Sequence, residues 1–85
     1  MRVTLWPLEK IIPYARNARK ISAQAVDKVA ASIREFGWRV PIVVDIESVI
    51  ITGHTRLLAA RKLGLKKAPV HVADDLTPAQ VRAYR

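Results

Sequence analysis

Apolar residues recur at helical spacing over one long segment of the chain. Ser22 precedes this segment as a candidate N-cap and Gly37 follows it, which predicts a helix over residues 23–36. The apolar stripe of this helix, which we expect to be buried, consists of Val26, Val29, Ala30, Ile33 and Phe36.

Short apolar and β-branched runs elsewhere predict strands at residues 3–6, 42–45, 49–51 and 68–72. The polar stretch 45–48 indicates a tight turn, so the second and third strands form an antiparallel hairpin. Pro69 falls at the start of the last strand, where no ladder donor is required. Thr77, Pro78 and Gln80 then form a helix-start signature for a final short helix.

The most informative stretch joins a strand to a helix at Gly53. A β-branched run ends at this glycine, and helix-forming residues follow at once over 54–63, with their apolar and small residues on one side. Backbone N–H groups and the positive end of the helix dipole then point at one place, which favours an anion, usually a phosphate. The side chains available there are His54, Thr55 and Arg56. The sequence therefore predicts an anion site at residues 53–56, the Gly53 turn.

The net charge of +8 on 85 residues favours polyanionic partners, with a merely solvated basic surface as the alternative. The segment 14–20 is either a solvated connector or a basic loop laid across the Gly53 turn. The candidate DNA contacts are Arg16, Lys20, Arg61, Lys62, Lys66 and Lys67.

The absence of cysteine excludes disulfides, thiolate catalysis and cysteine-based zinc sites. No apolar run approaches the roughly 18 residues of a membrane span, so we expect a cytoplasmic protein without a membrane partner. The Walker phosphate-loop spacing does not occur, and no nucleophilic triad can be assembled.

His54 is a candidate catalytic residue, because an imidazole beside the anion site could donate to a phosphate or carry a proton. The alternative is that His54 is only a turn residue, and His71 is read as a half-buried or surface residue. No metal site is expected. Asp74 and Asp75 are weak candidates, since an acidic pair before a helix is more often a turn.

Several segments together resemble one known family. Residues 53–65 are similar to the second box of ParB N-terminal domains, where glycine and arginine precede a helix ending in Leu-Gly. Residues 8–20 resemble the first box, in which Ile-x-Pro precedes a polar loop with Asn and Arg. Residues 29–37 and 68–72 resemble the family's Ser-Ile helix and the strand after the second box. The resemblance covers nearly the whole chain, in order.

This resemblance implies an α+β fold of the ParB/sulfiredoxin type, a small mixed β-sheet with packed helices, in a single domain of residues 1–85. It also implies a nucleoside triphosphate (CTP or ATP, with Mg²⁺), DNA as a partner, and self-association. By position, the phosphates would be faced by Gly53, His54, Thr55, Arg56 and the first-box Arg19, and the base would be approached by Gly37, Arg39 and Val40.

Three departures from the family pattern qualify these expectations. The family's second box usually places an acid and two arginines after glycine, whereas here the positions hold His54, Thr55 and Arg56. Val40 stands where glutamine is usual, which leaves the base open. Sulfiredoxin chemistry needs a cysteine in the phosphate turn and is excluded. The Gly-His-x-Arg variant resembles ParB-like domains of phages and mobile elements.

Three functions follow as hypotheses. The first is a ParB-like nucleotide-binding module associated with DNA. The second is an enzyme on the same fold, a nucleotide hydrolase or nuclease, with His54 as acid and base and Asp74 or Asp75 placing a metal. The third is an accessory domain of a DNA methyltransferase or other DNA-modifying protein, with the 85 residues excised from a longer chain.

Overall fold

The computed structural model describes residues 2–15 and 21–85 as a four-stranded mixed sheet with helices on both of its faces. The strands are β1 (Thr4–Pro7), β2 (Ile42–Val44), β3 (Ile50–Thr52) and β4 (Lys67–Val72). The helices are the 3₁₀ turn η1 (Leu8–Lys10), α2 (Ala23–Phe36), α3 (His54–Lys62) and α4 (Pro78–Tyr84). The expected α+β fold is confirmed.

The sheet has the order β1-β4-β2-β3, with β2 and β4 parallel and the other neighbours antiparallel. The predicted β2–β3 hairpin is confirmed, with a register irregularity between Val43 and Val44. Pro69 was expected at the start of its strand but is the third residue of β4, a central strand. The position tolerates proline because pairing with β2 begins only at Val70.

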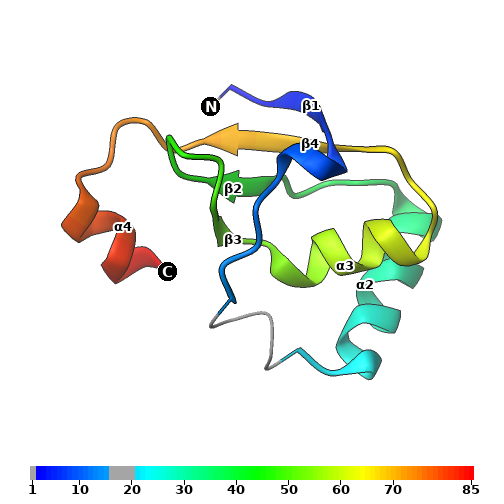
Figure 1. Ribbon diagram of the computed structural model, residues 1–85. Helices are drawn as coiled ribbons and strands as arrows, with labels where there is room; N and C mark the ends of the chain where they lie inside the picture. Colours follow the sequence, from blue (N-terminus) through cyan, green and yellow to red (C-terminus); the bar gives the residue numbers. More distant parts are fainter. Residues whose placement is uncertain (1, 16–20) are drawn as a thin grey trace.

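Two hydrophobic clusters lie on the two faces of the sheet, because successive strand residues point to opposite sides. The larger cluster contains Ile42, Val44 and Ile50 together with Leu57 of α3, and the smaller contains Val43 and Ile51. Leu76 and Val81 pack on the smaller cluster, so α4 covers that face. Figure 1 accordingly shows α3 and α4 in separate parts of the molecule.

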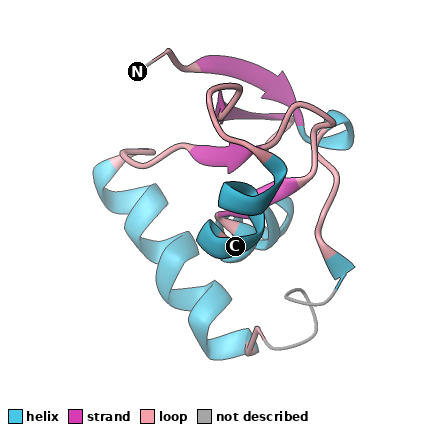
Figure 2. Cartoon of the chain, turned by 90° about the vertical axis from the view of Figure 1, so that its left-hand side faces the viewer, coloured by secondary structure: helices cyan, strands magenta, loops and turns pink. Residues whose placement is uncertain are grey.

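The two longest helices pack against each other, and the longer one is only partly covered. Of the predicted α2 stripe only Ala30 is fully buried. Phe36 is 60% exposed, so the predicted burial of Phe36 was wrong. A stripe on a 14-residue helix that packs against a nine-residue helix is covered over part of its length. Figure 2 shows α2 running along one side of the molecule, past the sheet.

Helix α3 is buried on more than the one side expected. Leu57 and Ala60 belong to the larger cluster, while Ala59, on another side of the helix, is also fully buried. Helix α3 contacts both α2 and the sheet, and its small side chains allow this close packing on two sides.

The predicted helix caps are confirmed. The Ser22 hydroxyl accepts from the N–H of Ala25 at 3.1 Å. Thr77 and Gln80 form a reciprocal capping box, with Pro78 in the first turn of α4. Among the described residues, no helix has the length and apolar character needed to cross a membrane.

Candidate functional site

The Gly53 turn has the backbone geometry that the sequence predicts. β3 ends at Thr52, Gly53 adopts a left-handed conformation with φ 106°, and α3 begins at His54. The first intrahelical hydrogen bond runs from the Leu57 N–H to the Gly53 carbonyl at 3.1 Å. The N–H groups of residues 54–56 therefore have no acceptor within the helix and point out of its start, where the dipole is positive.

Glycine is required at this position for two reasons. The left-handed backbone disfavours any residue with a side chain. In addition, a Cβ on Gly53 would lie 3.2 Å from both the Cα and the Cγ1 of Ile42, which is fully buried in β2. The start of α3 is thus pressed directly against the sheet.

His54 begins α3 and is only 8% exposed. Its Nε2 accepts the backbone N–H of Tyr14 at 3.1 Å, so the neutral ring carries its proton on Nδ1. Burial lowers the pKa of His54 below its ordinary value, and the nearby positive charge of Arg85 lowers it further. This geometry favours the reading of His54 as a structural turn residue, because Nε2 is already occupied. Its role as a phosphate donor or proton carrier stays a prediction.

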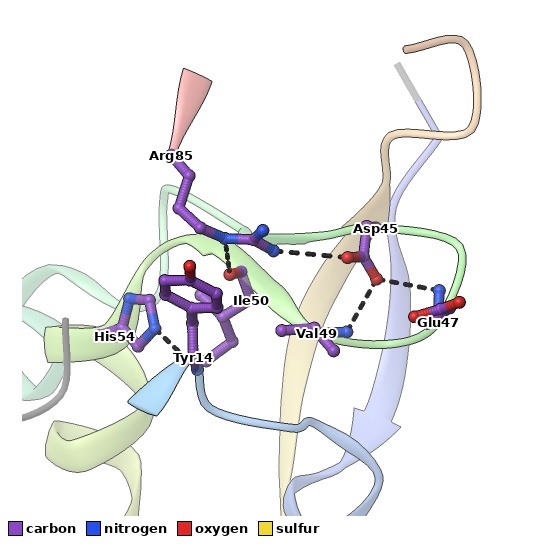
Figure 3. Close-up of polar contacts among 7 residues, drawn as sticks. All are labelled: Tyr14, Asp45, Glu47, Val49, Ile50, His54 and Arg85. Atoms are coloured by element: carbon purple, nitrogen blue, oxygen red, sulfur yellow. Dashed lines mark hydrogen bonds and ion pairs between the residues drawn. The ribbon is translucent and has the colours of Figure 1, made fainter. Parts of the chain in front are cut away.

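A group that the sequence did not single out surrounds His54 (Figure 3). Arg85 donates from Nε to the Ile50 carbonyl at 3.1 Å and from Nη2 to Asp45 at 3.3 Å. Its guanidinium carbon lies 4.2 Å from the centre of the Tyr14 ring. We call Tyr14, Asp45, His54 and Arg85 the Arg85 cluster. Asp45 was predicted only as a turn residue, and Arg85 carried no signal because its role depends on where α4 crosses the sheet.

Thr55 and Arg56 are half-buried in the first turn of α3. Within residues 2–15 and 21–85, the ion pairs are Lys62–Asp27 and Arg85–Asp45, so Arg56 pairs with none of the described carboxylates. The guanidinium of Arg56 is therefore available to an anionic ligand. The first-box arginine, Arg19, lies outside the described residues.

The predicted base-side residues make local contacts. Gly37 ends α2 with φ 78°, and Arg39 donates from Nε to the Phe36 carbonyl at 2.9 Å. The Val40 carbonyl accepts the indole N–H of Trp38. No hydrogen bond of the described residues joins this segment to the Gly53 turn, so its role beside a base stays a prediction.

The structure gathers three of the predicted DNA-contact residues. Arg61, Lys66 and Lys67 line a hollow of about 500 Å³ near the end of α3, which we call the basic hollow. Its other lining residues are Pro7, Leu8, Glu9 and Leu65. Lys62 instead pairs with Asp27 of α2, and Arg16 and Lys20 lie outside the described residues.

The weak metal candidates Asp74 and Asp75 are exposed and line a separate hollow that also contains His71. His71 is half-buried, as expected, and its Nδ1 lies 2.8 Å from the Arg2 carbonyl oxygen. No group of three or more potential metal-ligating side chains occurs in the described part of the chain. Among those residues, the acidic pair is not part of a metal-ligating group.

Comparison with known proteins gives consistent results. Residues 1–84 match the family described as the ParB N-terminal domain. The chain is 39% identical over 80 residues to the ParB-like nuclease domain-containing protein YnaK of Escherichia coli, covering 94% of this chain and 92% of YnaK. It is 35% identical over 75 residues to a probable chromosome-partitioning protein ParB of Campylobacter jejuni, covering 84% of this chain but only 27% of that protein.

Solved structures show the same fold. Sulfiredoxin from Arabidopsis thaliana matches with a TM-score of 0.80 and 28% identity, over 99% of this chain and 97% of its own. ParB from Caulobacter crescentus, in complex with CTP-γ-S, matches with a TM-score of 0.78 and 26% identity, over 95% of this chain and 48% of its own. The chain thus spans nearly all of the sulfiredoxin structure and about half of the C-terminally truncated ParB in the other structure.

Proposed function

The chain belongs to the family of ParB N-terminal domains, and from this premise we propose that it is a nucleotide-binding module that holds phosphates at the Gly53 turn. The observation that carries the proposal is the start of α3, where the N–H groups of residues 54–56 have no acceptor within the helix. Arg56 adds a guanidinium that pairs with none of the described carboxylates and can bind phosphate oxygens through two parallel N–H bonds.

The related ParB structure in complex with CTP-γ-S supports a nucleoside triphosphate as the ligand. CTP and ATP are both retained as candidates, because Val40 replaces the glutamine usual in the family. Mg²⁺ would accompany the nucleotide by neutralising the phosphate charge, and no protein carboxylate is assigned to it.

DNA association is the second part of the proposal. The basic hollow near the end of α3 presents the exposed cations Arg61, Lys66 and Lys67, and the whole chain carries a net charge of +8. Contacts of this kind attract phosphate backbones without reading sequence and weaken as salt is raised. A phage or mobile-element origin and self-association stay predictions.

Two alternative functions stay open. The name of YnaK, a ParB-like nuclease domain-containing protein, favours an enzyme on this fold. The occupied Nε2 of His54 counts against that histidine as its acid or base. The other alternative, an accessory domain of a DNA methyltransferase or other DNA-modifying protein, stays a hypothesis from the sequence.

Calorimetric titration with CTP, ATP and GTP, with and without Mg²⁺, tests the nucleotide proposal at low and physiological salt. We expect saturable binding of one nucleotide, weakened at least about tenfold in Arg56→Ala, because a charge-assisted hydrogen bond contributes roughly 1.5–3 kcal/mol. Arg61→Ala is the matched control, since Arg61 lies on the same helix at its other end. Absence of binding by the wild-type chain would overturn the proposal, and equal effects of the two variants would overturn the role of Arg56.

Turnover distinguishes the module from the enzyme. Nucleotide hydrolysis or DNA cleavage that requires Mg²⁺ and disappears in His54→Ala would establish the enzyme alternative. Binding without turnover supports the module.

A further inference from the structure

The side chain of Arg85 is buried more deeply than that of Lys62, the other cation that forms an ion pair among the described residues. It is 12% exposed and its partner Asp45 is 18% exposed, whereas the paired Lys62 and Asp27 are 54% and 55% exposed. An ion pair taken this far out of water must be compensated by well-placed hydrogen bonds, because desolvation of both charges is costly. The contacts of the Arg85 cluster supply them.

Arg85 joins α4 to the strand that leads into the Gly53 turn. Its Nε–H bonds to the Ile50 carbonyl at 3.1 Å, on β3, which is an edge strand of the sheet. The N–H of Ile50 donates to the Ile12 carbonyl at 2.9 Å. Both backbone polar groups of Ile50 on the open edge of the sheet are thus hydrogen-bonded, one to Ile12 and one to Arg85. β3 is therefore fixed three residues before Gly53 by contacts from outside the sheet.

Asp45 connects the same arginine to the hairpin turn. One carboxylate oxygen of Asp45 accepts the N–H groups of Glu47 and Val49 at 2.8 and 3.0 Å, and the other accepts from Arg85. The carboxylate thus shapes the β2–β3 turn and orients the guanidinium at once. Figure 3 shows Arg85 reaching from α4 across the hairpin between Asp45 and Tyr14.

Tyr14 links Arg85 to the first residue of α3. The guanidinium stacks 4.2 Å from the Tyr14 ring centre, and the Tyr14 N–H donates to Nε2 of His54 at 3.1 Å. That hydrogen bond exists only while His54 is neutral, because a protonated ring would face the Tyr14 N–H with a second donor. Among the residues drawn in Figure 3, Tyr14 bonds to the imidazole and Arg85 supplies the nearby positive charge, with Asp45 as the partner of Arg85.

We propose that Arg85 is a positioning residue for the anion site at the Gly53 turn. It fixes the first residue of β3, Ile50, and holds Tyr14 against His54, and so sets the direction in which the N–H groups of the first turn of α3 point. The inference rests on the proposed function, since it concerns the same site. Arg85 need not touch the ligand, because Asp45 compensates its charge, whereas Arg56 acts on the ligand directly.

The test compares Arg85→Met with Arg85→Lys and with Arg82→Met in the 85-residue chain. Arg82 is the control because it lies on the same helix and is exposed. Three quantities are measured for each variant: the affinity for CTP with Mg²⁺, hydrogen exchange of the Tyr14 amide, and the pKa of His54 from imidazole nitrogen shifts.

We expect Arg85→Met to weaken CTP binding about tenfold, to accelerate Tyr14 amide exchange, and to raise the His54 pKa towards its ordinary value. Arg85→Lys keeps the positive charge but loses the fork of hydrogen bonds. Its His54 pKa should therefore stay closer to the wild-type value than its affinity for CTP does. Arg82→Met should change none of the three. If Arg85→Met does not fold, Asp45→Asn serves instead, because it removes the carboxylate that orients Arg85, and the same weakening of binding is expected.

A folded Arg85→Met chain that binds CTP within twofold of wild type, with unchanged Tyr14 exchange, overturns the inference. If the wild-type chain binds no nucleotide at all, the proposed function has failed, which is a different result. In that case the Tyr14 and His54 readouts still decide whether Arg85 positions the start of α3.

Discussion

The two ends of α3 present positive charge in different ways. At the start, the direction of the backbone N–H groups is set by Gly53, which packs on Ile42, and by the Arg85 cluster, which includes the buried His54. At the end, Arg61, Lys66 and Lys67 are exposed side chains around a shallow hollow. A fixed set of donors selects a ligand by shape, whereas exposed cations attract any polyanion and are screened by salt. This difference is the basis of our proposal that the start of α3 binds a specific anion and that its end attracts DNA without specificity.

The two glycines that flank α3 give the largest expected difference. Gly53 and Gly64 both have positive φ, 106° and 73°, but a Cβ on Gly53 would meet Ile42, whereas one on Gly64 meets nothing within 4 Å. We expect Gly64→Ala to cost about 1 kcal/mol of unfolding free energy and Gly53→Ala roughly 3 kcal/mol, because strain and a backbone clash add there. Urea unfolding measures both. Equal losses would contradict the close packing of the Gly53 turn.

Removal of the three cations of the basic hollow should affect DNA and not nucleotide. In the triple variant Arg61→Ala, Lys66→Ala, Lys67→Ala, we expect duplex DNA affinity to fall at least about tenfold, and the slope of log affinity against log salt to decrease by roughly 2–3. Fluorescence anisotropy at several salt concentrations measures both quantities, with CTP calorimetry as the control. An unchanged salt slope would place the DNA contacts elsewhere.

Acid should destabilise the protein through His54, at the start of α3. Burial, and then the charge of Arg85, lower the pKa of His54 in the folded state below 6.5. The unfolded chain therefore takes up the proton first, and stability is lost as the pH falls through 6.5 towards the folded-state pKa. Urea unfolding between pH 8 and 5 should show this loss in wild type and a smaller one in His54→Gln, whose amide oxygen can still accept from Tyr14. The same pH dependence in both chains would contradict the assignment to His54.

The ion pair at the end of α3 should give the smallest effect. Lys62 and Asp27 are both more than half exposed, in contrast to Arg85 and Asp45. We expect Asp27→Asn or Lys62→Gln to change the unfolding free energy by less than about 0.5 kcal/mol, because solvent screens exposed pairs. A loss as large as that of Asp45→Asn, measured in the same way, would remove the distinction between the two ends.

Features set by neighbouring residues could be predicted from the sequence. The caps at Ser22 and Thr77, the β2–β3 hairpin and the strand–glycine–helix turn at Gly53 depend on contacts within a few positions. Each is specified by local residue types, such as a capping hydroxyl or a glycine that can adopt positive φ. The position of the candidate anion site was therefore available before any tertiary contact was known.

Features set by contacts between distant segments could not be predicted. Phe36 follows the helical stripe of α2 but is exposed at the end of that helix, and Pro69 lies inside a central strand, one residue before β4 begins to pair with β2. Asp45 and Arg85 stand 40 positions apart, as do Tyr14 and His54. No spacing rule links them, since the path of α4 across the hairpin decides which side chains meet.

Most strands and helices, the basic charge and the glycine turn at the start of α3 could be read from local residue types. Only the tertiary structure decided that His54 is a buried acceptor rather than a free imidazole, and that Arg85 holds the strand before the Gly53 turn. The two kinds of feature differ in the separation along the sequence over which the responsible interactions act. Capping and turn preferences act over three or four residues, whereas desolvation and ion pairing depend on which surfaces the packed sheet and helices bring together.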